Sequence, residues 1–500
     1  MTNKAQWQGH SLALLAGALL PLSFAPFHYY PIAIISLALW FATLQNCSAK
    51  QAAVRGFLFG FGMFTVGVSW IYVAIHEFGH ASILLAGLLT FASMAFLALI
   101  PAAIAYGIKR ISKGSLQTVD FVLLLPLAWL LFEWFKTWFL TGFPWLELGV
   151  SQIEGPLAGF IPIIGVLGVS LLTAISAGVV VVMVQSRQGV WLIPLVALWL
   201  TGGILKDTQW TEAIGTPLKV SLIQGNVPQA VKWEKEQVLH TLALYKQYTE
   251  QHWDSDIIVW PENAIPAFPH QIKTHYLDPL SAAARKHNTD ILLGIPDYNQ
   301  STKQYFNSMM SLGQNEAFYH KHHLVPFGEY IPLQTWLRGV IEFLDLPMSG
   351  FTSGKVQQPL LQLAGYKVGV SICYEDVFSS EIRRTLPDAA MLVNAANNAW
   401  YGDSFAPHQH LQISQSRALE MGRPILRATT SGISALIDST GHLQQISPQF
   451  EAAVITGMIQ PRQGSTPYVA WGQWPLFALS LFMLLIWAYY RQIISLKLRQ

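Results

Sequence analysis

Charged residues are scarce in this 500-residue chain. Lys, Arg, Asp and Glu supply only 12% of the residues and hydrophobic residues supply 52%, whereas soluble globular proteins carry about 25% charged residues. The formal net charge is +2, so no large basic or acidic surface is expected and a nucleic-acid partner is not indicated. The composition therefore predicts a membrane protein.

Cysteine is scarcer still, with only Cys47 and Cys373. Two cysteines in such different settings do not form a disulfide framework. Cys47 ends an apolar run, and we interpret it as an inert thiol. Cys373 lies in the stretch VGVSICYEDVF, residues 368–378, between a β-rich run and two acids. It is either a small core residue or a nucleophile, and composition leaves both open.

Apolar runs long enough to cross a bilayer, about 17–25 residues, recur through the first 205 residues and once near the end. We predict about eight transmembrane helices, near 10–27, 29–46, 54–76, 82–107, 119–140, 161–185, 190–205 and 474–491. The first run resembles a signal peptide, but more runs follow at once, so we expect a retained anchor. The predicted domains are an all-α bundle (1–205), an inserted domain (206–473) and a final helix with a tail (474–500).

The distribution of basic residues predicts an orientation. Lys and Arg occupy alternate loops and the C-terminal tail, at positions 50, 55, 109, 110, 113, 187, 491, 497 and 499. The intervening loops carry Glu77, Glu147 and Glu154 instead. Because basic loops stay cytoplasmic, both termini are expected in the cytoplasm and the inserted domain on the opposite face.

Residues 206–473 have an α/β pattern. Short β-rich runs such as DIIVWPENA, DILLGIP and YKVGVSIC alternate with helical patterns at 234–252, 271–287 and 408–421. Such alternation favours stacked layers of sheet and helix.

Three stretches of this insert carry candidate chemistry. Glu262 follows a strand that ends at Trp260-Pro261, Lys321 lies in YHKHHLVPFGEYIP, and Cys373 lies at a predicted strand-to-helix turn, where helix amides lower a thiol pKa. A Cys nucleophile needs a base, which Glu262 can supply, and an oxyanion needs a positive charge, which Lys321 can supply. Taken singly, each is more often a core Cys, a strand-end acid or a solvated Lys, and chain spacing says nothing about proximity.

Together, WPENA, YHKHHLVPFGEYIP, SICYED and NAANNAWYGDSFAPHQHLQ resemble the carbon–nitrogen hydrolase (nitrilase) superfamily and, with the apolar runs, the apolipoprotein N-acyltransferase family. The resemblance covers nearly the whole chain. It implies an αββα sandwich, with Glu262 as base, Lys321 as oxyanion stabiliser and Cys373 as nucleophile. It also implies supporting or substrate-binding roles at Trp233, Glu329, Tyr374 and Glu375. One departure is Asn397-Asn398, where relatives often read Asn-Asp.

The resemblance further implies the reaction and its setting. A fatty acyl chain would pass from the sn-1 ester of a phospholipid, typically phosphatidylethanolamine, through a Cys thioester to the amine of a diacylglyceryl-cysteine on an apolipoprotein. The enzyme would be a monomer in the bacterial inner membrane with a periplasmic catalytic domain, and the chemistry needs no metal or organic cofactor. The segment IEFLDLPMSGF, residues 341–351 with Phe343 and Leu344, is a candidate lid or an ordinary loop.

Other interpretations remain open. HEFGH, residues 76–80, matches the H-E-x-x-H pattern of zinc proteases, although Gly79 weakens a helix and no third ligand is evident. A membrane-tethered amidase would use the same three residues with a soluble acceptor. A transporter with a binding module would need more intramembrane charge than Glu133 and Lys136, which we interpret as holding a headgroup or docking the insert. His320, His322 and His323 are interpreted as a polar loop, and His408 and His410 as packing or supporting groups.

Overall fold

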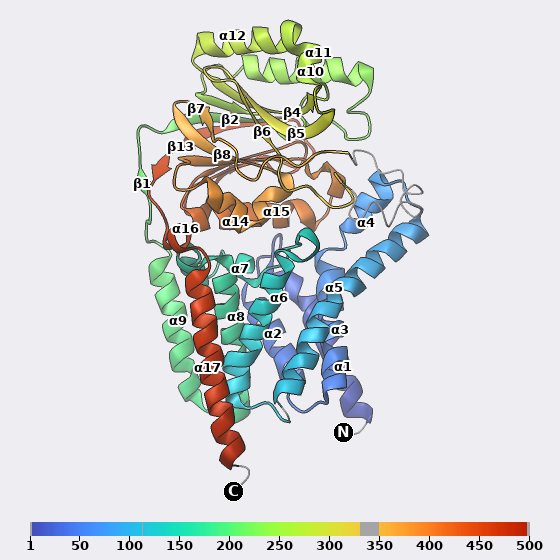
Figure 1. The fold of residues 1–500 in the computed structure, drawn as a ribbon, viewed down its shortest axis with the longest axis vertical. Coiled ribbons are helices and arrows are strands. Elements are labelled where there is room, and N and C mark those ends of the chain that lie inside the picture. Colours follow the sequence, from blue (N-terminus) through green and yellow to red (C-terminus); the bar gives the residue numbers. More distant parts are fainter. Residues whose placement is uncertain (1–2, 113, 331–349, 498–500) are drawn as a thin grey trace. The chain divides into compact units, whose positions relative to one another are not determined.

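The computed structural model describes residues 3–112, 114–330 and 350–497. Figure 1 traces the chain, which forms two compact units. The helical unit comprises Met1–Tyr72, Ile83–Thr208 and Ala470–Gln500, and the α/β unit comprises Val73–Ser82 and Gln209–Val469. Residues 341–349 of the candidate lid, with Phe343 and Leu344, lie outside the described residues.

Every predicted apolar run contains a helix in the structure. The longer helices of the helical unit are α1 (Asn3–Leu19), α2 (Pro31–Thr43), α3 (Ala49–Gly67), α5 (Ile83–Ser112), α6 (Leu125–Lys136), α8 (Ile161–Ser186), α9 (Leu192–Leu205) and α17 (Trp474–Lys497). Close packing uses small residues. A Cβ on Gly17 would lie 1.9 Å from the Phe59 carbonyl oxygen of α3, so α1 and α3 approach closely only because Gly17 has no side chain.

The prediction of about eight spans is shown only in part. Among the described residues, three helices are long and apolar enough to cross a membrane: Ile83–Ser112, Pro156–Ser186 and Trp474–Ile493. A fourth arises if Ala49–Gly67 and Ile71–Phe78, bent by 62°, form one span. The 13 residues of α2 extend only about 20 Å, short of a hydrocarbon core of about 30 Å. A run of apolar residues does not show where the helix within it ends. The predicted spans are therefore longer than several of the helices in the structure.

Glu133 and Lys136 of α6 point into the helical unit and are buried. Glu133 Oε1 accepts hydrogen bonds from the indole of Trp129 at 2.7 Å and from the Leu148 amide at 2.8 Å. Lys136 Nζ donates to the Trp145 carbonyl at 2.7 Å. The contacts that the structure shows for this pair thus fasten residues 145–148 to α6, rather than exposing a charge to a headgroup.

The basic loops gather at one end of the helical unit. Lys109 Nζ donates to the carbonyls of Gln45 at 3.0 Å and Gly114 at 2.6 Å. At the end of α17, Arg491 pairs with Asp120 at 3.2 Å. In Figure 1, α1 begins and α17 ends at this same end of the unit.

The α/β unit contains two six-stranded sheets, ordered β13-β2-β3-β4-β5-β6 and β12-β11-β10-β9-β8-β7. The first sheet consists of β2 (Leu218–Gln224), β3 (Ile257–Val259), β4 (Asp290–Asn299), β5 (Gln304–Leu312), β6 (Ala317–His320) and β13 (Ala453–Ile459). The second consists of β7 (Leu361–Leu363), β8 (Tyr366–Ile372), β9 (Met391–Ala396), β10 (Ile425–Thr429), β11 (Ala435–Ile437) and β12 (Leu443–Ile446). Strands β2, β3 and β4 run parallel, as do β8, β9 and β10.

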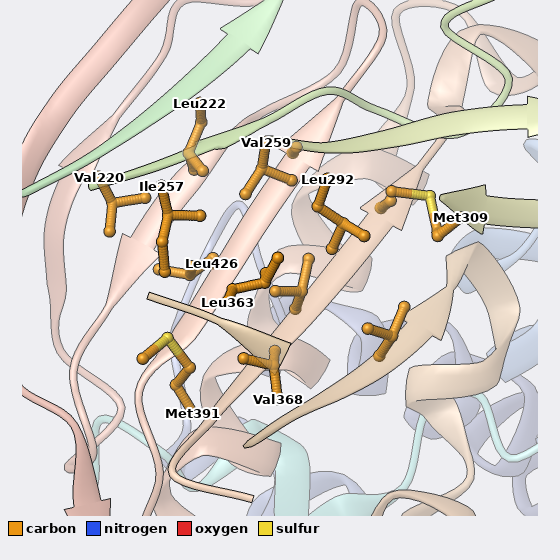
Figure 2. Packing of buried hydrophobic residues seen from close by; sticks show 14 of the residues in the cluster. Val220, Leu222, Ile257, Val259, Leu292, Met309, Leu363, Val368, Met391 and Leu426 are labelled. Atoms are coloured by element: carbon orange, nitrogen blue, oxygen red, sulfur yellow. The ribbon is translucent and has the colours of Figure 1, made fainter. Parts of the chain in front are cut away.

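The two sheets face each other across an apolar core, which Figure 2 shows. Val220 and Val259 of the first sheet and Val368 and Leu426 of the second belong to this one buried cluster. A second cluster joins the outer face of the first sheet to α10 (Lys235–Glu250) and α12 (Asp278–His287). A third joins the second sheet to α14 (Ser379–Ile382) and α15 (Phe405–Met421). The predicted αββα sandwich is confirmed.

Candidate active site

The three predicted catalytic residues each follow a strand. Glu262 comes three residues after β3 (Ile257–Val259), Lys321 directly follows β6, and Cys373 directly follows β8. Lys321 Nζ lies 3.4 Å from Glu262 Oε1, and the charges of both residues act on the Cys373 thiol. The fold thus brings together side chains from both sheets, which chain spacing alone did not predict.

Two carboxylates share the Lys321 ammonium. Glu329 lies 2.9 Å from Lys321 Nζ, and its Oε2 accepts the Val325 amide at 2.8 Å. Burial acts to lower the pKa of Lys321, but the charges of Glu329 and Glu262 together raise it well above its ordinary value. Lys321 is therefore a fixed cation in a buried site.

Asn307 of β5 braces both acids and was not predicted. Its Nδ2 donates to Glu262 Oε1 at 2.7 Å and to Glu329 Oε1 at 2.8 Å. The Asn397 amide donates to the other oxygen of Glu262 at 2.8 Å. The only sequence signal for Asn307 is a carboxamide in the middle of an otherwise buried strand, where an amide needs partners.

The Cys373 thiol is protonated at rest, which corrects the expectation that helix amides lower its pKa. Burial and the charge of Glu262 raise the pKa of Cys373 far above its ordinary value, although Lys321 acts to lower it. The predicted helix is only a five-residue 3₁₀ turn, η8 (Cys373–Val377), too short to act as a helix N-terminus. A neutral thiol requires a base, so the position of Glu262 gains importance.

Glu375 ties the Lys321 segment to the Cys373 turn. Its Oε1 accepts the His322 amide at 2.6 Å and the His323 amide at 3.1 Å, and its Oε2 accepts the Ile372 amide at 2.6 Å. The Tyr319 hydroxyl donates to it at 3.0 Å. Tyr374, between Cys373 and Glu375, is 9% exposed, and its ring packs edge-on against those of His323 and Phe378.

Trp233 differs from the other predicted site residues because its side chain is 42% exposed. The residue of this loop whose charge interacts with Glu262 is its neighbour Lys232, which is buried. Among the described residues, no hydrogen-bond partner reaches Lys232 Nζ. Burial lowers the pKa of Lys232 to about 8, against the charge of Glu262. The sequence analysis missed Lys232 because a lysine beside a tryptophan carries no signal of burial.

The HEFGH segment does not have zinc-protease geometry. Its helical turn, η2 (Ala74–Phe78), is a π-helix that ends before Gly79, and His80 has a left-handed backbone with φ +50°. His76 and His80 therefore do not occupy one face of an α-helix. Within residues 3–112, 114–330 and 350–497, no three His, Cys, Asp or Glu side chains are placed to hold a metal.

Comparison with known proteins first defines the class. Residues 219–468 match the family model of carbon-nitrogen hydrolases, and this class agrees with the two facing sheets of the α/β unit. Residues 16–179 match a second model, that of the apolipoprotein N-acyltransferase N-terminal domain. Nit3 of Saccharomyces cerevisiae, a nitrilase-superfamily structure, matches with TM-score 0.37 and 16% identity over 50% of this chain and 93% of its own.

Relatives then identify the particular family. The apolipoprotein N-acyltransferase of Methylococcus capsulatus is 45% identical over 94% of this chain and 93% of its own length. That of Azotobacter vinelandii is 43% identical over 97% of this chain and 96% of its own length. That of Pseudomonas aeruginosa is 41% identical over 96% of both chains. The chain belongs to the apolipoprotein N-acyltransferase family.

Proposed function

We propose that this acyltransferase works through a thioester on Cys373. The donor is the sn-1 ester of a membrane phospholipid, phosphatidylethanolamine, and the acceptor is the α-amine of the diacylglyceryl-cysteine that begins an apolipoprotein. The observation that carries the proposal is the buried group of Cys373, Glu262 and Lys321. Glu329, Glu375, Tyr374 and Trp233 support this centre or contact substrate.

In the first half-reaction, the Cys373 sulfur attacks the ester carbon while Glu262 takes the thiol proton. The Lys321 ammonium stabilises the negative charge that develops on the carbonyl oxygen. The carbon–oxygen bond to glycerol then breaks, and Glu262 returns the proton to the leaving alcohol. The products are an acyl-thioester and a lysophospholipid.

In the second half-reaction, the acceptor amine attacks the thioester carbon and Glu262 takes a proton from its nitrogen. The carbon–sulfur bond breaks as the amide forms, and the proton passes back to the Cys373 sulfur. Water would hydrolyse the same thioester, so the low exposure of Cys373, 8%, supports a site that excludes competing attack.

The orientation belongs to the same proposal. The loops rich in Lys and Arg lie at one end of the helical unit, near Lys109 and Arg491. Basic loops stay in the cytoplasm, so we place this end and both termini there, in a bacterial inner membrane. The α/β unit is then on the periplasmic side, where both substrates are anchored in the bilayer. We propose that the enzyme acts there as a monomer.

The test is intact-protein mass spectrometry of detergent-purified protein mixed with phosphatidylethanolamine. The wild type is expected to gain one fatty-acyl mass that neutral hydroxylamine removes, as it does a thioester. Cys373→Ala is expected to gain none, and Cys373→Ser is expected to keep a stalled ester that survives hydroxylamine. Cys47→Ala is the matched control and should acylate like the wild type.

Adding a diacylglyceryl peptide tests the second half. The adduct should discharge onto the peptide amine. If the thioester yields only free fatty acid, the amidase alternative is favoured. Transfer of the acyl group to any small soluble amine equally well would favour it too. An acyl adduct on Cys373→Ala would remove Cys373 from the mechanism.

A further inference from the structure

A buried polar network adjoins the Cys373 turn, and the proposed mechanism does not use it. Its members are Asp376 of η8, Asn398 of the turn η10 (Asn398–Tyr401), His410 and Ser414 of α15, and Arg427 of β10. Each is at most 3% exposed. Burying two charged groups and an imidazole is costly unless they are paired and hydrogen-bonded, so their placement beside the nucleophile calls for a functional reason.

The network reaches the backbone of Cys373. His410 Nε2 lies 2.7 Å from Asp376 Oδ1 and 3.2 Å from the carbonyl oxygen of Cys373. Asn394 Nδ2 donates to the same carbonyl at 3.3 Å. On its other oxygen, Asp376 is 3.3 Å from Arg427 Nη1. Asp376 thus sits between a cation and the imidazole, and the imidazole faces the nucleophile's own peptide group.

The partners of Asn398 determine which nitrogen of His410 carries the proton. Arg427 Nη2 lies 3.3 Å from Asn398 Oδ1. A guanidinium only donates, so the side-chain atom facing it must be the amide oxygen. The remaining atom, Nδ2, lies 3.2 Å from His410 Nδ1 and only donates, so His410 Nδ1 must accept. The proton of the ring therefore resides on Nε2, which faces two acceptors.

The surrounding charges favour the same neutral state. Burial and the Arg427 cation on β10 lower the pKa of His410, against the Asp376 carboxylate on η8. Asn398, on η10, adds no charge. Both effects favour the neutral ring of His410, which donates through Nε2.

The backbone of Cys373 needs such a donor. Cys373 has φ +51°, in the left-handed region, which is unfavourable for a residue with a Cβ. Conformations of this kind persist only where neighbouring groups hold them, and they concentrate at functional sites. The His410 and Asn394 donors to the Cys373 carbonyl are the groups in place to do so.

We propose that His410, kept in the Nε2–H tautomer by Asn398, is a positioning residue that holds Cys373 in its left-handed conformation and so aims the thiol. The inference rests on the proposed role of Cys373 as nucleophile. His410 acts through the Cys373 carbonyl and Asp376 and takes no proton from the thiol. Asn398 then sets the protonation of the imidazole in this chain.

The first test reads the tautomer directly by NMR of full-length protein in detergent with ¹⁵N-labelled histidine, assigned by loss of a signal in His410→Gln. The wild type should show a protonated Nε2 and an unprotonated Nδ1 throughout about pH 6–8. Asn398→Asp offers Nδ1 an acceptor and should convert His410 to the imidazolium at the same pH. A wild-type ring protonated on Nδ1 would overturn the proposal.

The second test separates positioning from substrate binding. Gln can place an N–H where Nε2 lies, whereas Leu cannot. At saturating phosphatidylethanolamine, His410→Leu should form the thioester at least about tenfold more slowly and His410→Gln within about threefold of wild type, with the donor KM unchanged in both. His408→Leu, on the same helix, is the matched control.

A folded His410→Leu variant that acylates at the wild-type rate would refute the positioning role. A His410→Gln variant that acylates no faster than His410→Leu would also refute it. If His410→Leu does not fold, the NMR result and the rate of His410→Gln decide. Acyl transfer by Cys373→Ala would instead refute the proposed nucleophile, while the tautomer result would stand, so the two failures are distinguishable.

Discussion

At the scale of the residue, the centre depends on how two acids share one cation. Glu262 and Glu329 both contact Lys321, and Asn307 donates one hydrogen bond to each. The ammonium offsets only one of the two negative charges. Asn307 is therefore a neutral bridge that hydrogen-bonds both carboxylates and fixes where each of them lies.

Replacing Asn307 with Asp should slow thioester formation at least about tenfold. Two hydrogen bonds to charged groups, each worth about 1.5–3 kcal/mol, are exchanged for repulsion among three acids, and about 1.4 kcal/mol already corresponds to a factor of ten. Single-turnover acylation followed by mass spectrometry measures the rate. Asn299→Asp, at the exposed end of β4, is the matched control, and a wild-type rate in Asn307→Asp would show that the bridge is dispensable.

Glu375 should make stability depend on pH. Burial raises the pKa of Glu375 to about 7 from an ordinary 4.5, although the Ile372 amide and Lys321 act to lower it. The folded protein then holds this proton more tightly than the unfolded chain. The contribution of the Glu375 proton to the free energy of unfolding is therefore fully present below about pH 4.5. It is lost, by up to about 3 kcal/mol, as the pH rises through about 7.

The measurement is the Tm of detergent-purified wild type and Glu375→Gln between about pH 4.5 and 8. The wild-type Tm should fall more steeply with rising pH than the variant Tm, because Gln does not titrate. Parallel curves for the two proteins would contradict a titrating Glu375.

At the scale of the element, helix α6 is fastened to residues 145–148 by buried polar side chains. Lys136 Nζ donates to the Trp145 carbonyl and lies 4.8 Å from the Phe132 ring centre. Glu133 holds the Leu148 amide from the same helix. The apolar pattern of α6 predicts neither contact, because that pattern does not depend on which residues occupy these two positions.

Lys136→Met should lower the stability of the helical unit. It leaves the Trp145 carbonyl without this donor, at a cost of about 1–3 kcal/mol, and leaves the nearby Glu133 carboxylate buried without its cation. Adding Glu133→Gln should recover part of the loss, because removing both charges costs less than removing one. Thermal unfolding measures the effect, with exposed Glu154→Gln as control, and an unchanged Tm for Lys136→Met would contradict a fastening role.

At the scale of the whole molecule, the proposed orientation predicts which loops face the periplasm. Lys303→Cys, in the α/β unit, and Lys50→Cys, in the first turn of α3, are each placed in a Cys47→Ala, Cys373→Ala background. Both positions are exposed. A membrane-impermeant maleimide added to spheroplasts should label Lys303→Cys and should label Lys50→Cys only after lysis, because basic loops stay inside. The opposite labelling would invert the topology.

The architecture followed from the sequence where local pattern was enough. Apolar runs located every long helix of the helical unit, and alternating strand and helix patterns, with the motifs, predicted the sandwich. Helix length did not follow: α2 has only 13 residues, because a hydrophobic average does not register a proline or a turn. The predicted number of spans is therefore shown only in part by the described helices.

The sequence by itself determined that a Glu and a Cys would each follow a strand, since strand ends are marked by local residues such as Pro261. Only the tertiary structure decided that Asn307 and Lys232 lie with them, that the thiol is protonated at rest, and that His410 faces the backbone of Cys373. These features depend on burial and on atoms from distant segments, which set both hydrogen-bond geometry and the cost of charge. Neither quantity can be read from the order of residues along the chain.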